Sequence, residues 1–209
     1  MVKNMAKDNK SVETQQQILD AARRIFSQKG LAGARMQEIA DEAGINKALL
    51  HYYYRNKNLL FEQVLEEAVR KLFKPLAVFL MEDSDLFDKI RNLCHLYYSV
   101  LMKYPFIPNF VTNEASMDRE RVFKLIKLDG IIDGKNKTVK QIEQYIEDGK
   151  IRPVDPRDLI WNIISLCVFP IISRPIAGRM LYQSEEEMEA ALKSRADHVA
   201  DFIIAAIKV

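Results

Sequence analysis

The chain has 209 residues, 48% of them hydrophobic and 29% charged, which suits one or two buried cores and excludes a disordered protein. The net charge of +2 hides an uneven distribution, because residues 1–60 contain 10 Lys/Arg and 6 Asp/Glu, whereas residues 61–209 contain 21 and 23. This N-terminal excess suits contact with a polyanion or arises by chance on a solvated surface. Two cysteines, Cys94 and Cys167, exclude a disulfide framework, and we expect buried reduced thiols.

The first residues are polar and contain no apolar segment, which excludes a signal peptide or membrane anchor and predicts a cytoplasmic location. We expect residues 1–11 to form a mobile basic arm. A helix is predicted over about 13–29, with Ile18, Ala22 and Phe26 facing inward, and Gly30 and Gly33 are expected to end it.

Two short helices joined at a glycine are predicted next. The first of these helices is predicted to bury one side, whose apolar residues lie at helical spacing: Met36, Ile39, Ala40 and Ala43. Gly44 permits the positive backbone torsion that ends this helix, and Asn46 can cap the next one. Leu50 and Tyr54 lie one turn apart on the inner side of that second helix. The pattern is typical of a helix-turn-helix, whose second helix reads DNA.

The register of the second helix selects the residues that can touch a duplex. With Leu50 inward, Ala48 and Tyr52 point most directly outward, flanked by Leu49 and His51. Lys47 and Tyr53 lie at the margins, where they can reach phosphate. Leu49 has two open interpretations, which are contact with a thymine methyl group or packing on a neighbouring helix.

Over residues 12–62 the chain resembles the TetR family of bacterial regulators. The resemblance rests on Ile18, Ala21, Ala22, Phe26, Gly30, Ile39, Ala40, Ala43, Gly44, Leu50, Tyr52, Tyr54, Lys57 and Leu60. It implies a dimeric repressor that releases DNA when a small molecule binds its C-terminal domain. Three positions depart from the family pattern: Arg35 replaces a capping Ser or Thr, Ala48 a glycine and His51 a tyrosine. Arg35 can still reach phosphate by its charge, and the other two changes bear on sequence preference.

The predicted DNA contacts are therefore Arg35, Asn46, Lys47, Ala48, Leu49, His51, Tyr52, Tyr53 and Lys57. We place the DNA-binding domain at residues 12–56 and an effector-binding and dimerisation domain at 57–209. Helices are predicted in this second domain over about 57–80, 85–104, 108–116, 119–148, 156–173 and 185–207, and no strand pattern is found. Pro75 is expected to kink or end the first of these helices, and Gly130 and Gly134 weaken the fourth, where a bend or a break is an open alternative to a continuous helix. The predicted fold class is all-α.

Residues 159–169 are apolar almost all round, which favours a helix buried on both sides, one towards a pocket and the other towards a partner subunit. Large aromatic and thioether side chains suit an apolar or aromatic effector, with polar groups to orient it. The ligand candidates are Tyr97, Tyr98, Met102, Phe106, Phe110, Phe123, Trp161, Asn162 and Ser165. The dimer candidates are Leu166, Phe169, Leu192, Val199, Phe202 and Ile203. Packing within the chain's own core is the alternative for both groups.

The helix over 57–80 suggests how a ligand controls DNA binding, because it begins beside the helix-turn-helix and ends in the effector domain. Tilting it would change the spacing of two reading helices in a homodimer, which must match one DNA turn of about 34–36 Å. The sequence offers no catalytic, metal or cofactor constellation, so we expect no enzyme and no cofactor. The predicted function is a ligand-responsive repressor on a palindromic double-stranded operator, and the alternative is a helical protein-interaction module without DNA binding.

Overall fold

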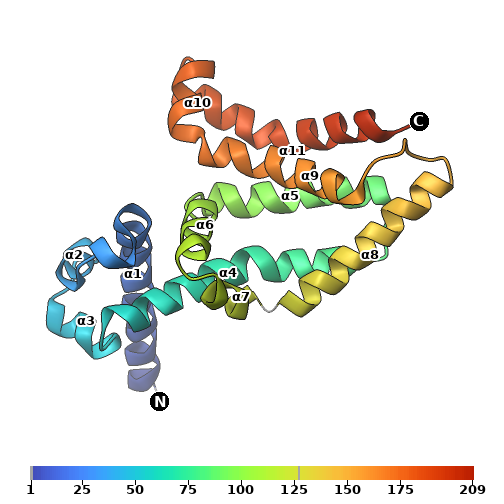
Figure 1. The fold of residues 1–209 in the computed structure, drawn as a ribbon. Helices are drawn as coiled ribbons and strands as arrows, with labels where there is room; N and C mark the ends of the chain where they lie inside the picture. Colours follow the sequence, from blue (N-terminus) through green and yellow to red (C-terminus); the bar gives the residue numbers. More distant parts are fainter. Residues whose placement is uncertain (1, 127) are drawn as a thin grey trace. The chain divides into compact units, whose positions relative to one another are not determined.

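The computed structural model describes the backbone of residues 2–126 and 128–209 and the side chains of residues 11–126 and 133–209. Helices make up almost all of it (Figure 1). In chain order they are α1 (Val2–Gly33), α2 (Met36–Glu42), α3 (Lys47–Tyr53), α4 (Lys57–Met81), α5 (Leu86–Lys103), α6 (Ile107–Met117), α7 (Arg119–Ile126), α8 (Leu128–Glu147), α9 (Pro156–Ile172), α10 (Arg174–Leu181) and α11 (Glu185–Ile207). Among the described residues the single extended pairing is an isolated bridge between Ile151 and Lys208.

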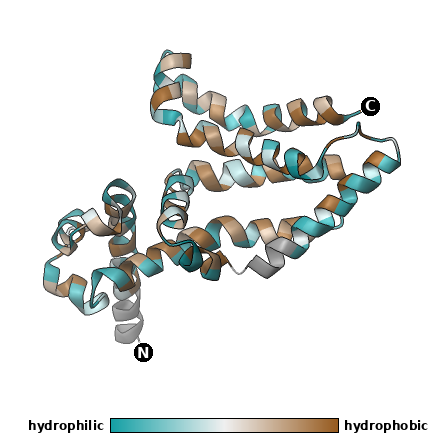
Figure 2. Ribbon diagram, viewed as in Figure 1, coloured by the Kyte–Doolittle hydropathy of each residue, from teal (hydrophilic) through white to brown (hydrophobic). Residues whose placement is uncertain are grey.

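The chain divides into two compact units, Met1–Ala68 and Val69–Val209. The division falls inside α4, so this one continuous helix contributes to both units. The sequence-based boundary at 56/57 instead assigns the whole helix to the second domain. Figure 2 shows that apolar and polar residues alternate along the helices of each unit, the pattern of amphipathic helices that bury one side.

The N-terminal unit has a small core built from α1, α2, α3 and the start of α4. Its fully buried side chains include Ile18, Ile39, Leu50 and Leu60. Phe26 of α1 meets Phe61 of α4 edge to face, with ring centroids 4.9 Å apart, which fixes these two helices against each other. Backbone torsions leave the helical region at Gly30 (φ 64°), where the predicted break in α1 occurs.

The core of the C-terminal unit lies between α5, α9 and α11, which pack on one another in turn. The buried side chains of this core come from all three helices, for example Leu93, Ile163 and Val199. Cys94 and Cys167 are both buried within it, as expected. Two exposed pairs, Arg91–Asp201 and His95–Asp197, link α5 to α11 at 2.8 and 2.9 Å.

Several element predictions differ from the structure. The first helix begins at Val2 rather than near residue 13, although the mobility expected of residues 1–11 stays a prediction. The region predicted to be helical over 119–148, with a possible bend or break at Gly130 and Gly134, contains two helices, because α7 ends at Ile126 and α8 begins at Leu128. α10 follows directly after α9 and was not predicted. Pro75 and Pro170 lie inside α4 and α9, which continue past them.

One further expectation concerned α9, which was predicted to be buried on both sides. Within the chain only one side of α9 is buried, and its buried residues include Leu159, Ile163 and Cys167. On the other side, Trp161 and Phe169 are 67% and 66% exposed.

Among the described residues, no single helix is long and apolar enough to cross a membrane. α9 and α10 reach that length and composition only together, and they are bent by 81° at their junction.

Candidate DNA-binding site and effector cavity

The turn between α2 and α3 has the local geometry of a helix-turn-helix. Gly44 adopts φ 66°, a left-handed conformation that favours glycine, and the Ile45 N–H donates to the Ala40 carbonyl at 3.0 Å. Asn46 then caps α3, because its Oδ1 accepts the Leu49 N–H at 2.8 Å. Leu50 is fully buried, so the register of α3 agrees with the inward position expected for it.

This register leaves one side of α3 open to solvent. Lys47, Ala48, His51 and Tyr52 are exposed, and Tyr52 has 81% of its side-chain surface accessible. Leu49 is exposed by 36%, so α3 does not bury it in the core of the unit. An exposed helix side that the described residues leave uncovered is what insertion into a major groove requires.

The ring of His51 has a defined orientation. Its Nδ1 lies 3.3 Å from the Arg55 carbonyl oxygen. Because a carbonyl can only accept a hydrogen bond, Nδ1 carries a proton and Nε2 of the neutral ring is an acceptor. The acceptor suits the exocyclic amino groups of adenine or cytosine in the major groove.

Polar contacts hold α3 to the rest of the N-terminal unit. The Tyr53 hydroxyl donates to Ser11 Oγ at 3.2 Å, and Gln15 Nε2 donates to the Tyr54 hydroxyl at 3.4 Å. Burial raises the pKa of Tyr54, so its phenol stays protonated. Arg23, largely buried on α1, forms ion pairs with Asp20 and with Glu67 of α4. The C-terminal end of α3 is thus held to α1, and α1 is held to α4.

Lys57 and Arg35 were predicted to contact phosphate, and the structure gives each a local setting. Lys57 Nζ donates to the carbonyl oxygens of Ala34 at 2.9 Å and Ala32 at 3.4 Å, at the end of α1. Arg35 is exposed before α2. Its backbone N–H donates to the Glu38 carboxylate at 3.3 Å. A hydrogen bond from Lys29 lowers the pKa of Glu38.

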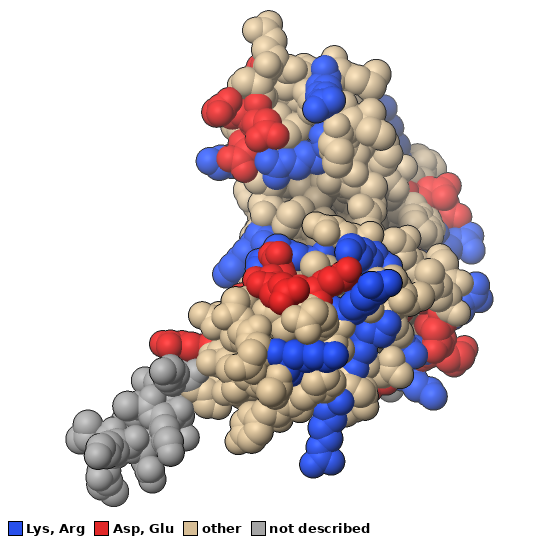
Figure 3. All heavy atoms as spheres, turned by 90° about the vertical axis from the view of Figure 1, so that its left-hand side faces the viewer, with Lys and Arg blue, Asp and Glu red and all other residues tan. Residues whose placement is uncertain are grey.

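Charge on this side of the protein is mixed. In Figure 3, Lys and Arg side chains are spread among uncharged atoms, with Asp and Glu side chains gathered beside some of them. The ion pairs of the N-terminal unit include Arg24 with Glu42, at 2.6 Å. A mixed surface of this kind suits a few positioned phosphate contacts better than a broad electrostatic attraction.

The C-terminal unit contains an apolar cavity of about 190 Å³ between four helices. Its lining residues are Leu76 and Leu80 of α4, Leu86, Lys89, Ile90, Leu93 and Tyr97 of α5, Lys135, Thr138 and Ile142 of α8, and Leu159, Ile160, Ile163 and Ile164 of α9. Two larger hollows of about 610 and 630 Å³ lie open at the surface beside α10 and beside α4 and α5. The enclosed cavity is the better candidate for a small apolar ligand.

Only Tyr97 of the predicted ligand residues lines this cavity. Tyr98 is buried and donates to the Leu166 carbonyl at 3.4 Å, Met102 packs against the core, and Phe106 meets Phe110 edge to face. The remaining four, Phe123, Trp161, Asn162 and Ser165, are exposed. The structure therefore does not gather these residues at one site.

Sequence reasoning missed the aliphatic cavity residues and Lys89. A signal for Lys89 was present, because it lies three residues after Leu86 in the stripe that continues with Ile90 and Leu93. A lysine at an inward helical position is uncommon and indicates a buried charge.

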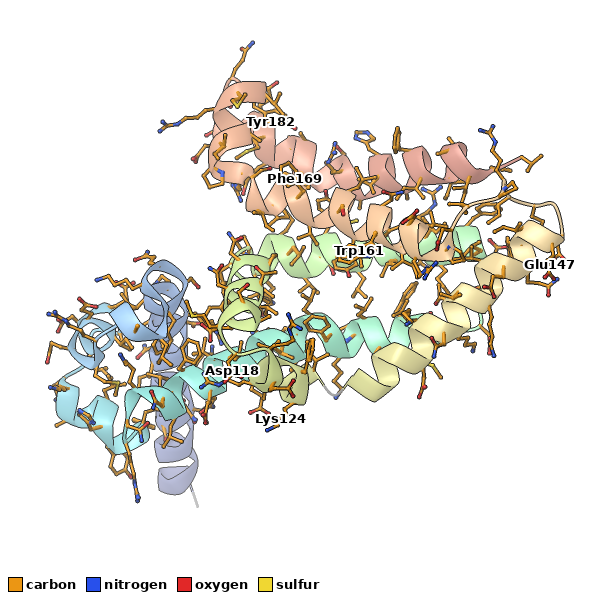
Figure 4. All side chains as sticks on the ribbon, viewed as in Figure 1. Asp118, Lys124, Glu147, Trp161, Phe169 and Tyr182 are labelled. Atoms are coloured by element: carbon orange, nitrogen blue, oxygen red, sulfur yellow. The ribbon has the colours of Figure 1, made fainter. Side chains whose placement is uncertain are left out.

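The predicted dimer residues fall into two groups. Leu192, Val199 and Ile203 are buried in the chain's own core. Phe169 and Phe202 are exposed by 66% and 67%, and Leu166 is half-buried. Figure 4 labels Phe169 and Trp161, two exposed aromatic residues on α9.

Comparisons with known proteins agree with both units. The family described as "Bacterial regulatory proteins, tetR family" matches residues 18–64, and "Tetracyclin repressor-like, C-terminal domain" matches residues 87–203. The chain is similar to the HTH-type transcriptional regulator RutR of Escherichia coli K12, with 30% identity over 165 residues, 78% of this chain and 76% of that protein. It is also similar to the HTH-type transcriptional repressor NicS of Pseudomonas putida, with 26% identity over 75% of this chain and 74% of that protein.

A solved structure shares the fold. The ketosteroid transcriptional regulator KstR2 of Mycobacterium tuberculosis superposes with a TM-score of 0.68 at 16% identity, covering 93% of this chain and 94% of that one. The predicted all-α fold, with a helix-turn-helix domain followed by a helical domain, is confirmed. The two family matches and the relationship to RutR together show that the chain belongs to the TetR family of bacterial transcriptional regulators, which are DNA-binding proteins and not enzymes.

Proposed function

We propose that this protein is a ligand-responsive repressor that binds a palindromic operator as a homodimer and is released by a small effector. The exposed side of the capped helix α3 is the observation that carries the proposal, with Tyr52 at its centre. A helical interaction module would not need a reading helix in this register. Lys47, Tyr52, Tyr53 and Lys57 are proposed to hold phosphate, and Ala48, Leu49 and His51 to face base edges.

The homodimer is proposed to form through the exposed apolar residues of α9 and α11. Trp161 and Phe169 of α9 and Phe202 of α11 are each about two-thirds exposed, and aromatic residues of this size are typical of interface centres. The substitution Phe169→Glu should shift the protein from dimer to monomer in light-scattering chromatography. Met117→Glu, which changes an exposed apolar residue on α6, is the matched control. A dimer that tolerates the Phe169 change would place the interface elsewhere.

The effector is proposed to occupy the cavity of the C-terminal unit. Leu76 and Leu80 of α4 line it, and the same helix begins at Lys57 in the N-terminal unit. A ligand that displaces the end of α4 therefore acts on a helix that both units share. Because linkage is reciprocal, an effector that weakens DNA binding must itself bind less tightly to the DNA complex.

The test is fluorescence anisotropy on duplex DNA from upstream of the protein's own gene, compared with a scrambled duplex over a range of salt concentrations. For specific binding, the logarithm of the association constant should fall linearly with the logarithm of the salt concentration, with a slope of about −0.9 per phosphate contact. Lys47→Met should lower the slope by about one contact, whereas Lys193→Met on α11 should leave it unchanged.

Selection from random DNA gives a second measurement, and it works without a chosen operator sequence. His51→Phe is expected to change the selected motif, because it removes the Nε2 acceptor. An unchanged motif would remove His51 from the base-reading residues. Failure of the unmodified protein to enrich any sequence would favour the helical interaction module instead.

A further inference from the structure

Side chains from two other helices hold the C-terminal end of α4, which ends at Met81, and the first residues after it. Thr138 Oγ1 donates to the Leu80 carbonyl at 3.4 Å, Lys137 Nζ to Met81 at 2.7 Å, Lys89 Nζ to Glu82 at 2.9 Å and Gln141 Nε2 to Ser84 at 2.6 Å. The last carbonyl groups of a helix have no intrahelical donor and attract cations. These four donors are called the α4 cap. Three of them belong to α8, and Lys89 belongs to α5.

Lys89 and Thr138 are cap residues that also line the cavity, and of these two Lys89 carries a charge. Its side chain is only 2% exposed. Among the described side chains, no carboxylate lies within ion-pair distance of its ammonium, whereas Lys137 is paired with Asp83 at 2.7 Å. Burial, with a smaller contribution from the charge of Lys137, lowers the pKa of Lys89, and the charges of Asp83 and Glu82 oppose this shift. A buried ammonium held by a single carbonyl is incompletely compensated, so an anion would stabilise it strongly.

The other residues of the cavity wall limit the size and the polarity of the uncharged part of a ligand. Apart from Lys89, Lys135, Thr138 and the Tyr97 ring, the lining side chains are leucine and isoleucine. A cavity of about 150 Å³ is known to hold benzene, so 190 Å³ accepts a single ring or a short chain with one small substituent. The wall therefore suits a compact hydrocarbon body.

Two further buried polar atoms lie in residues that meet in the α4 cap. Ser84 Oγ and Gln141 Oε1 are buried and have no hydrogen-bond partner among the described residues. Both residues meet in the α4 cap, where Gln141 donates to the Ser84 carbonyl. Ser84 and Gln141 do not line the cavity, so the Lys89 ammonium is the charged donor beside it that a carboxylate requires.

We propose that the effector is a small carboxylic acid, whose hydrocarbon part fills the cavity and whose carboxylate takes the Lys89 ammonium away from the Glu82 carbonyl. This inference rests on the proposed function, since it assigns a chemical class to the effector of that site. Removal of one donor from the α4 cap loosens the end of α4. Ligand binding is thereby coupled to the helix that begins in the DNA-binding unit.

The test is isothermal titration calorimetry on the full chain, without DNA, at neutral pH. The probes are benzoate and hexanoate, each compared with its neutral isostere, benzamide or hexanamide. We expect each acid to bind at least about tenfold more tightly than its amide, because a hydrogen bond between charged groups is roughly twice as strong as a neutral one. Lys89→Met keeps the length of the side chain and should abolish this preference, and Lys89→Arg should retain it. Lys137→Met, which changes a cap residue that does not line the cavity, should also retain it.

Equal binding of acids and amides to the unmodified protein would overturn the proposal, as would an acid preference that survives in Lys89→Met. Failure of all four probes to bind would overturn it as well. The comparison of acid with amide on the unmodified protein does not depend on the folding of any variant. Operator binding is measured separately, so a protein that prefers acids but binds no DNA contradicts the proposed function alone. A protein that binds its operator but does not prefer acids contradicts only this inference.

Discussion

Lys57 is expected to have two roles, one in holding the end of α1 and one in binding a DNA phosphate, and one substitution tests both. Its ammonium has three donor positions, and two of them reach the carbonyl oxygens of Ala34 and Ala32 at the end of α1. The third remains available for a DNA phosphate. Lys57→Met preserves most of the apolar stem and removes all three donors.

The expected loss of stability follows from the geometry. A hydrogen bond from a charged group contributes about 1.5–3 kcal/mol when it is well formed. Lys57 is only half-buried, so its bond to Ala34 falls at the lower end of this range, and its bond to Ala32, long at 3.4 Å, adds little. We therefore expect Lys57→Met to lower the free energy of unfolding by about 1–2 kcal/mol.

Urea unfolding of the full chain gives the measurement. Circular dichroism reports on the helices of both units, whereas fluorescence of Trp161, the one tryptophan in the sequence, reports on the C-terminal unit. The loss should therefore appear mainly in the circular dichroism. Lys74→Met, on the exposed side of the same helix, is the control and should leave both signals unchanged.

A different result would contradict each of the two roles of Lys57. Unchanged stability would show that the two carbonyl contacts contribute nothing net. A salt dependence of DNA binding equal to that of the unmodified protein would show that Lys57 does not hold a phosphate, since one contact changes the slope by about 0.9.

Three further predictions concern separate parts of the molecule. Tyr52→Phe should weaken binding to all operator variants by a similar factor in anisotropy titrations, because its hydroxyl is expected to meet phosphate; unequal losses would assign it to base reading. Gly134→Ala should lower stability to urea by about 1–2 kcal/mol, because the new Cβ would lie 2.7 Å from Leu80 Cβ and this clash outweighs the gain in helix propensity; a more stable variant would show that α8 moves freely away from α4. Hydrogen bonds from Arg157 lower the pKa of Asp155 from 3.8 to about 2, so its charge stabilises the fold above pH 3.8 and this contribution is lost as the pH falls towards 2. Asp155→Asn should therefore have a lower urea midpoint than the unmodified protein at neutral pH and an equal one near pH 2, and a constant difference would exclude this titration.

The sequence was most informative where structure depends on neighbours along the chain. The left-handed turn at Gly44, the cap at Asn46 and the inward position of Leu50 involve residues within a few positions of one another. Helical spacing alone therefore predicted the register of α3 and the exposure of Tyr52. The family signature lies in this same local stretch, which is why both the fold class and the DNA-binding unit could be predicted.

Only the tertiary structure decided which residues line the cavity, because four helices supply them from positions between 76 and 164. Aromatic residues are equally suited to a core, a pocket or an interface, so composition could not separate buried Tyr97 from exposed Trp161. The setting of Lys57 likewise depends on carbonyl groups more than 20 positions away, and that of Lys89 on the end of another helix. Local sequence determined the helices and their amphipathic sides, whereas packing between distant helices determined what each side meets, because burial depends on partners that helical periodicity does not identify.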